Sequence, residues 1–278
     1  MHIVVCVKQV PDSSQIRVHP VTNTIMRQGV PAVVNPYDLV SLEEALRIRD
    51  RFGARVTVLS MGPKMAVDAL RKCVSYGADD AVLITDRVFA GSDTLATSYA
   101  LASAIRTIGA ERPVDMVFCG KQTIDGDTAQ VGPGIARRLG LQQLTYVSKI
   151  ERVDPEAREI VVHRRAEGGV QVLQTKLPCL VTMMEGANTI RFAGMDDMFR
   201  AARCDIAEWD HKAAGIAELT RCGLKGSPTV VKKVFAPSAK AVKAQCFDSA
   251  GKTPREVVDA LLARVFEQHP SIEEEIAS

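Results

Sequence analysis

Short hydrophobic runs without polar alternation recur through the first half of the chain. Such runs are typical of strands buried on both faces of a parallel sheet. The intervening segments repeat hydrophobic residues at helical spacing. Strands that alternate with helices predict an α/β fold, namely a Rossmann-like parallel sheet with helices on both faces. The predicted strands are 2–7, 56–61, 81–85 and 116–119, and the helices follow at about 39–48, 64–76, 95–108 and 131–139.

A different pattern begins after Leu141. Strand-like segments separated by turns predict an antiparallel strand insertion over about 144–175. An apolar strand returns at 178–184. Nearer the start of the chain, the polar stretch 12–33 predicts a hairpin-like excursion.

The last third of the chain predicts contacts with other proteins. Methionines and phenylalanines in the excursion 185–203 suit an adaptable partner surface, although a helix packed on its own core would have the same spacing. Residues 204–252 have little periodicity, which is uncommon inside a compact domain, so we expect an arm that lies across another subunit. A final helix starts at Thr253-Pro254. The predicted division is an α/β domain at 1–203 and an arm with a helix at 204–278.

Composition excludes several classes of protein. The net charge of +2 and the aromatic content of 5% argue against nucleic acid or an acidic membrane surface as the main partner. No apolar stretch reaches ~18 residues and no signal peptide is recognisable, so we expect a soluble cytoplasmic protein without membrane insertion. Seven scattered cysteines suit core positions in a reducing compartment, and the five histidines have no metal-ligand spacing.

The strongest candidate for chemistry is the loop between the strand ending at Gly120 and the helix starting at Val131. Free N–H groups at a helix start, together with the helix dipole, attract phosphate at the carboxyl end of a parallel strand. The alternative is structural: Asp127 or Thr128 caps the helix and Asp125 makes an Asx-turn. The loop matches neither GxxxxGK[ST] nor GxGxxG.

Other polar residues follow strands at the same predicted edge. Lys8 follows the first strand, and the loop 86–94 carries charges, hydroxyls and a glycine after the third. Asn35 and Asp38 precede a helix, where they would act either as caps or as ligands.

Several motifs, taken in order, resemble the beta subunit of electron-transfer flavoproteins over almost the whole chain. The core of the match is GKQxIDGDTAQVGP, starting at Gly120. The resemblance implies a heterodimer with an alpha subunit that carries one FAD, and a nucleotide bound in this chain. The motifs are Val5-Cys-Val-Lys-Gln-Val10, Asn35-Pro36, Ser60-Met-Gly-Pro63, Gly77-Ala-Asp79, Gly120-Lys-Gln-Thr-Ile-Asp125 and Leu177-Pro178.

The family has two branches, which differ in this nucleotide. One binds AMP as a structural filler; the other bifurcates electrons, binds a second FAD and takes hydride from NADH. Three segments look like the bifurcating branch, so we favour FAD: 85–98, 125–130 and 223–229. The residues implied around the cofactor are Cys6, Val7, Lys8, Asn35, Asp38, Met61, Gly62, Asp93, Thr94, Thr97, Gly120, Lys121, Gln122, Asp125, Gly126, Asp127, Thr128, Ala129, Gln130 and Val131. Those implied near the flavin ring and NADH are Arg87, Phe89, Ala90 and Gly91.

The resemblance also implies partners. In the bifurcating reading, one electron goes to ferredoxin or flavodoxin and the other passes through the alpha-subunit FAD to an acyl-CoA dehydrogenase. Segment 185–200 is similar to the family's partner-recognition loop, but has Ile190-Arg-Phe192 in place of the usual Pro-Arg-Tyr. The residues implied in partner recognition are Asn188, Arg191, Phe192, Met195 and Met198, with Met195 at the position of a leucine anchor.

Two other functions are compatible with parts of the pattern. One is a non-bifurcating electron carrier with AMP. The other is a stress-type or ATP-hydrolysing adenine-nucleotide binder, against which the lack of a glycine-rich ATP loop counts. The redox readings require no side chain as acid, base or nucleophile, because the cofactor performs the redox chemistry within a complex.

Overall fold

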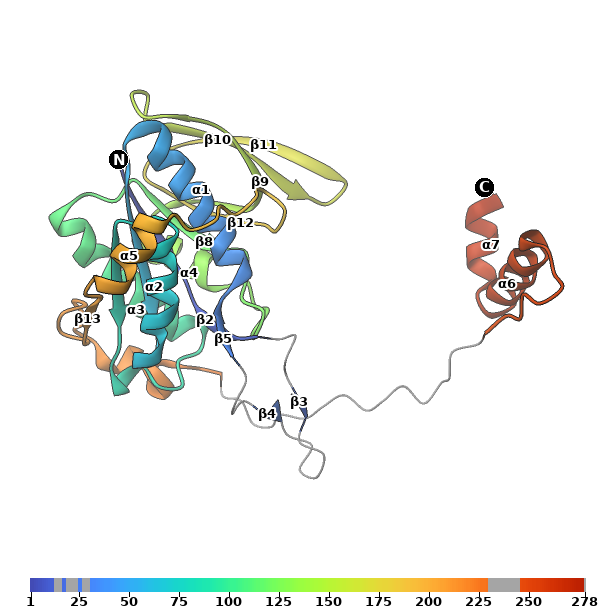
Figure 1. Ribbon diagram of the computed structural model, residues 1–278, viewed down its shortest axis with the longest axis horizontal. Helices are drawn as coiled ribbons and strands as arrows, with labels where there is room; N and C mark the ends of the chain where they lie inside the picture. The colour runs from blue at the N-terminus through green and yellow to red at the C-terminus, as the bar shows by residue number, and fades with distance from the viewer. Residues whose placement is uncertain (13–16, 19–24, 27–30, 230–245, 278) are drawn as a thin grey trace. The chain divides into compact units, whose positions relative to one another are not determined.

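The computed structural model describes residues 1–12, 17–18, 25–26, 31–229 and 246–277 (Figure 1). The chain divides into two compact units, Met1–Phe235 and Ala236–Ser278. Within the described residues, the first unit is built on a nine-stranded sheet of order β11-β10-β9-β12-β8-β1-β6-β7-β13.

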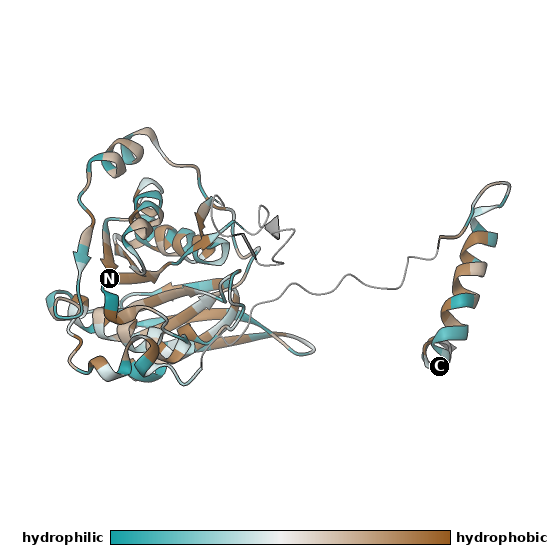
Figure 2. Cartoon of the chain, turned by 90° about the horizontal axis from the view of Figure 1, so that it is seen from below, coloured by the Kyte–Doolittle hydropathy of each residue, from teal (hydrophilic) through white to brown (hydrophobic). Residues whose placement is uncertain are grey.

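The centre of this sheet is parallel, as the hydrophobic runs predict. Every pairing from β9 through β12, β8, β1, β6 and β7 to β13 is parallel. In β1, Ile3 and Val5 pack in the core on one face, whereas Val4 and Cys6 pack on the other, which explains the missing polar alternation. Much of the sheet is coloured brown, for hydrophobic residues, in Figure 2. The bounds are β1 His2–Cys6, β6 Arg55–Met61, β7 Asp80–Ile84, β8 Met116–Gly120, β9 Gln142–Asp154, β12 Cys179–Met183 and β13 Ala207–Trp209.

Helices cover both faces of the sheet. Helices α1 (Pro36–Phe52) and α2 (Val67–Ser75) pack on one face, and α3 (Thr94–Glu111) and α4 (Val131–Leu139) pack on the other. The predicted α/β fold is therefore confirmed. Helix α5 (Met195–Arg203) lies against α2, where Arg71 donates hydrogen bonds to the Ala201 and Cys204 carbonyls.

The predicted antiparallel insertion is also present. Strand β9 pairs with β10 (Glu159–Ala166), which pairs with β11 (Gly169–Lys176), both antiparallel. The predicted hairpin-like excursion over 12–33 agrees with two antiparallel pairs near the N-terminus, while residues 13–16, 19–24 and 27–30 lie outside the described residues. These pairs are β2 (Gln9–Pro11) with β5 (Ala32–Val34), and β3 (Arg17–Val18) with β4 (Ile25–Met26).

Residues 204–229 pack on the α/β domain itself. Strand β13 adds to the sheet edge beside β7, and Ala214, Ile216 and Cys222 are buried in the core with α3. The unit boundary after Phe235 thus differs from the predicted boundary after Arg203. The elements here are too short to show periodicity, so the sequence pattern resembles that of an unpacked arm. Residues 230–245 of the predicted arm lie outside the described residues.

The second unit contains α6 (Pro254–Gln268) and α7 (Pro270–Ala277). The predicted start of α6 is confirmed by a capping box between Thr253 and Glu256. Val258, Leu261 and Leu262 of α6 are exposed. Across the described ranges, no helix is both long and apolar enough to cross a membrane.

Candidate functional site

A cavity of about 840 Å³ opens at the carboxyl ends of β1, β6, β7 and β8. The strand order reverses between β1 and β8, and crevices at such switch points are the usual ligand sites of open α/β sheets. Most of the residues predicted around the cofactor, and all four predicted near the flavin ring and NADH, line this cavity. They are Cys6, Val7, Lys8, Asp38, Met61, Gly62, Arg87, Phe89, Ala90, Gly91, Asp93, Thr94, Thr97, Gly120, Lys121, Gln122, Gly126, Thr128, Ala129, Gln130 and Val131.

Asp38 joins the two strand ends at the switch point. Its carboxylate accepts hydrogen bonds from the Lys8 N–H (2.8 Å), after β1, and from the Gly120 N–H (3.1 Å), at the end of β8. Burial raises the pKa of Asp38 to about 7, although hydrogen bonds from Asn35, Lys8 and Gly120 act in the opposite direction. A side chain at position 120 would collide with Asp38 and would lie 2.6 Å from Tyr37 Cβ, so the site requires glycine.

Asn35 does not line the cavity but fixes the loop that does. Its Nδ2 donates to the Gln122 carbonyl (2.9 Å) and its Oδ1 accepts from the Ile124 N–H (3.2 Å). Asn35 stands at the N-cap position of α1, but its side chain makes no cap hydrogen bond and bonds the loop instead.

The start of α4 is open to the cavity. Its N-cap residue is Gln130, and no side chain caps it. The alternative in which Asp127 or Thr128 caps this helix is therefore wrong. Val131 and Gly132, in the first turn, line the cavity, so their part of the helix can offer N–H groups to an anion.

The two aspartates of the loop are directed to side chains of this chain. Asp125 forms an ion pair with Lys8 at 2.7 Å, and Asp127 accepts a hydrogen bond from Gln122 Nε2 at 2.8 Å. Neither aspartate lines the cavity. Burial acts to raise the pKa of Asp125, but hydrogen bonds from Lys8 and Thr123 outweigh it and lower that pKa. These contacts relieve the repulsion that a free carboxylate would exert on a phosphate.

The loop after β7 forms a second part of the cavity wall. Asp86 pairs with His211 at 2.6 Å, and this hydrogen bond lowers the pKa of Asp86. Arg87 is exposed and lines the cavity, and among the described residues no carboxylate lies within ion-pair distance of it. Phe89 also lines the cavity and is largely buried.

Segment 223–229 returns to this loop and is held by Asp93. Asp93 Oδ1 caps α3 through the N–H groups of Leu95 (2.9 Å) and Ala96 (3.0 Å). Its Oδ2 accepts from the Thr229 N–H (3.2 Å) and hydroxyl (2.8 Å), and its own N–H donates to Ser227 (2.8 Å). Asp93 therefore holds the wall in place, since both carboxylate oxygens are engaged within the chain.

Several lining residues were not among the predicted site residues. Leu101 follows Thr97 by one helical turn, a spacing that could have indicated it. His211 lies outside the lining but bonds Asp86, which lines the cavity. The two residues are 125 positions apart, so the sequence pattern could not indicate this contact. The additional lining residues are Pro63, Lys64, Thr85, Asp86, Ser92, Leu101, Cys119, Thr123 and Gly132.

Two cysteines line the cavity. Cys6 and Cys119 lie on adjacent strands, and both are buried. A hydrogen bond with Cys6, together with burial, raises the pKa of Cys119, so it lacks the thiolate character of a nucleophile. Over the part of the chain that the structure describes, no group of three His, Cys, Asp or Glu residues could hold a metal ion.

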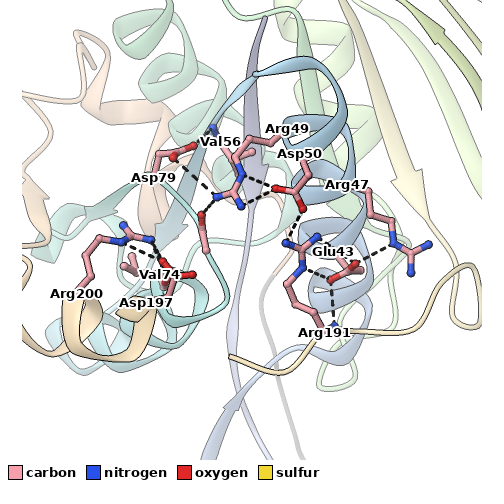
Figure 3. A network of polar contacts seen from close by, with 11 residues as sticks. Glu43, Arg47, Arg49, Asp50, Val56, Val74, Asp79, Arg191, Asp197 and Arg200 are labelled. Carbon is pink, nitrogen blue, oxygen red and sulfur yellow. Dashed lines mark hydrogen bonds and ion pairs between the residues drawn. The ribbon is translucent and has the colours of Figure 1, made fainter. Parts of the chain in front are cut away.

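The predicted partner loop lies away from this cavity and is fastened to α1. Arg191 Nε donates to Glu43 (2.8 Å), and Arg191 Nη1 donates to Asp50 (2.8 Å), as Figure 3 shows. Burial acts to raise the pKa of Glu43, but hydrogen bonds from Arg191 and Arg47 lower it on balance. Arg191 is thus held within the chain.

Apolar side chains of the same loop project outward. Phe192 is 98% exposed and Met195 is 67% exposed. Met198 and Phe199 follow Met195 at helical spacing and are also exposed, whereas Ala201 is buried against the domain. Asn188 ties the loop to α1 by donating to the Val40 carbonyl and to Glu44, each at 3.0 Å.

Comparison with known proteins gives consistent matches. The electron transfer flavoprotein domain family matches residues 22–214. Protein FixA of Azotobacter vinelandii is 64% identical over 277 residues, which cover 100% of this chain and 99% of that protein. The electron transfer flavoprotein subunit beta of Clostridium acetobutylicum is 44% identical over 270 residues, covering 97% and 99%. The caffeyl-CoA reductase-Etf complex subunit CarD of Acetobacterium woodii is 42% identical with the same coverage.

Proposed function

The chain belongs to the electron transfer flavoprotein family as a beta-type subunit, and on this premise we propose that it binds FAD in the cavity and bifurcates electrons from NADH. It acts with an alpha subunit that carries a second FAD. One electron goes to a ferredoxin or flavodoxin and the other, through the alpha-subunit FAD, to an acyl-CoA dehydrogenase.

The observation that carries the choice of FAD is the extent of the cavity. One part is formed by the strand ends and the loop 120–132, and the other by the loop 85–94 with Thr97 and Leu101. An adenine mononucleotide on the first part would leave the second without a ligand. FAD consists of an AMP half and a flavin half, so it matches a site with two parts.

The residues present suit such a ligand. The uncapped start of α4 would hold a phosphate, while Asp125 and Asp127 are directed to Lys8 and Gln122. Met61, Phe89 and Leu101 offer apolar surface, and Thr94 and Thr97 offer hydroxyls beside it. When bound, FAD would supply hydride acceptance and one-electron transfer.

This chain's own groups would position the cofactor and set its electrostatic surroundings. Asp38 fixes the strand ends under the ligand, and Asp93 fixes the wall that carries Arg87. Arg87 brings a positive charge to the cavity without a carboxylate partner among the described residues. A cation beside a group that gains negative charge favours its reduction.

The proposed partners correspond to two other surfaces. The exposed side chains Phe192, Met195 and Met198 suit an acyl-CoA dehydrogenase. The name of CarD associates that relative with a caffeyl-CoA reductase complex. The second unit, with its exposed leucines, suits the alpha subunit. The seven free cysteines suit a reducing compartment, and we propose the cytoplasm.

Acid release of cofactors from the purified heterodimer tests the proposal. We expect two FAD and no AMP per heterodimer, with both flavins reduced by NADH. One FAD and one AMP per heterodimer would instead indicate a non-bifurcating carrier.

A further inference from the structure

Two arginines lie over the ring of Tyr99, on the α3–α4 side of the cavity, and a third arginine contacts one of them. The Arg221 guanidinium lies over the Tyr99 ring at 4.2 Å, and that of Arg138 lies over the same ring at 5.5 Å. Arg106 donates a hydrogen bond to the Arg138 carbonyl. Burial and the charge of Arg221 both lower the pKa of Arg138, so the positive charges are close enough to repel one another.

The positive charge of this group is only partly compensated. Arg221 pairs with Glu218 at 3.5 Å. Among the residues that the structure describes, no carboxylate lies within ion-pair distance of Arg106, Arg138 or the exposed Lys225. The group therefore keeps an excess of positive charge at the surface.

Exposed leucines connect this charge to the cavity wall. Leu95 is 50% exposed, and its carbonyl accepts a hydrogen bond from Arg138 at 3.0 Å. Leu224 is 62% exposed and packs so closely on Gly91 that a Cβ there would lie 2.6 Å from it. Gly91 lines the cavity, and Leu95 directly follows Thr94, which also lines it. These arginines and leucines, together with Lys225, are called the basic surface: Leu95, Arg106, Arg138, Arg221, Leu224 and Lys225.

We propose that the basic surface docks an acidic one-electron carrier protein. The inference rests on the proposed function, because the carrier must approach a redox cofactor in the adjoining cavity. Interfaces of electron-transfer partners are small, and unbalanced charge steers the encounter and fixes its orientation. Exposed leucines among arginines supply the apolar centre that such a contact needs. Carboxylates of the carrier would relieve the repulsion within the arginine group.

Direct binding tests the docking surface apart from the redox function. We would titrate ferredoxin into the complete heterodimer by calorimetry at low and moderate ionic strength, using Arg221→Glu and Lys225→Glu. Arg165→Glu is the matched control, because it makes the same charge change at an exposed arginine of β10. We expect affinity to fall about tenfold or more at low salt for the first two variants, to fall less at ~0.3 M salt, and to be unchanged in the control.

The outcomes separate the two proposals. Equal weakening in Arg165→Glu would mean that net charge alone matters and would overturn the docking surface. Loss of the alpha subunit from Lys225→Glu would identify this face as the subunit contact and would also overturn it. A third outcome is that ferredoxin binds in a salt-sensitive way, that Lys225→Glu abolishes this binding, and that the unmodified heterodimer nevertheless fails to reduce ferredoxin with NADH. This outcome would overturn bifurcation but support the docking surface.

Discussion

Asp93 and Thr229 are joined by two hydrogen bonds to one carboxylate oxygen, from the Thr229 N–H at 3.2 Å and from its hydroxyl at 2.8 Å. The residues are 136 positions apart in the chain. The other oxygen of Asp93 caps α3. The contact with Thr229 therefore fastens segment 223–229 to the cavity wall.

Thr229→Val should loosen the cavity wall. The valine keeps the volume but loses the hydroxyl bond, so we expect stability to fall by about 1 kcal/mol. Amide hydrogen exchange in residues 86–93 should become faster, measured by mass spectrometry. Thr175→Val, on β11, controls for the change of side chain. Equal exchange in the two variants would show that Thr229 does not hold the wall.

Asp38 should make the protein less stable as pH rises. Its pKa of about 7 in the folded state exceeds that of an unfolded aspartate, near 3.9, so the folded state binds the extra proton between these values. Stability should therefore fall from about pH 4 to pH 7, by at most ~1.4 kcal/mol per pH unit from this group.

Urea unfolding of the parent and Asp38→Asn across this pH range measures the effect. The stability of Asp38→Asn should not show the fall between about pH 4 and pH 7 that the Asp38 carboxyl causes. The variant should also be less stable at pH 5, by about 1–3 kcal/mol, because its amide N–H₂ cannot accept from a second backbone N–H. Parallel pH profiles for the two proteins would contradict the assignment to Asp38.

Arg87→Ala should impair reduction of the beta-site flavin by NADH while leaving the alpha flavin unaffected. Reduction adds negative charge, and one positive charge at about 4 Å contributes roughly 1–4 kcal/mol, with the lower value applying at an exposed site. Stopped-flow absorbance on proteins with equal FAD content measures the rate, with Arg137→Ala as an exposed control. Identical rates in parent and Arg87→Ala would make Arg87 a solvated surface charge.

Met195→Glu should slow electron delivery to the acyl-CoA dehydrogenase without changing cofactor content. Met195 is exposed on α5 and lies outside the cavity lining, so a charge there would oppose docking alone. Saturation kinetics with the dehydrogenase are the measurement. Met65→Glu is the matched control, since Met65 is 63% exposed elsewhere on the chain. An unaltered saturation curve for Met195→Glu would remove this residue from the interface.

The sequence by itself was sufficient to predict the parallel sheet and the edge at which the cavity opens. Runs such as Ile3–Val7 and Met116–Cys119 are hydrophobic at every position because both faces of these strands are covered, and this property is local. Parallel strands alternating with helices place all strand ends on one edge, so the residues after Cys6 and Cys119 had to meet there.

Only the tertiary structure decided which polar side chains bond to one another within the chain and which face the cavity without such a partner among the described residues. Asp125 and Asp127 look alike in the sequence, but one pairs with Lys8 and the other bonds Gln122. Arg191, in the predicted partner loop, forms an ion pair with Glu43 of α1 that the sequence pattern does not show. A hydrogen bond depends on two groups meeting at about 3 Å. Lys8 and Asp125 are 117 positions apart, and Glu43 and Arg191 are 148 positions apart, so no periodic signal in the chain indicates that they meet.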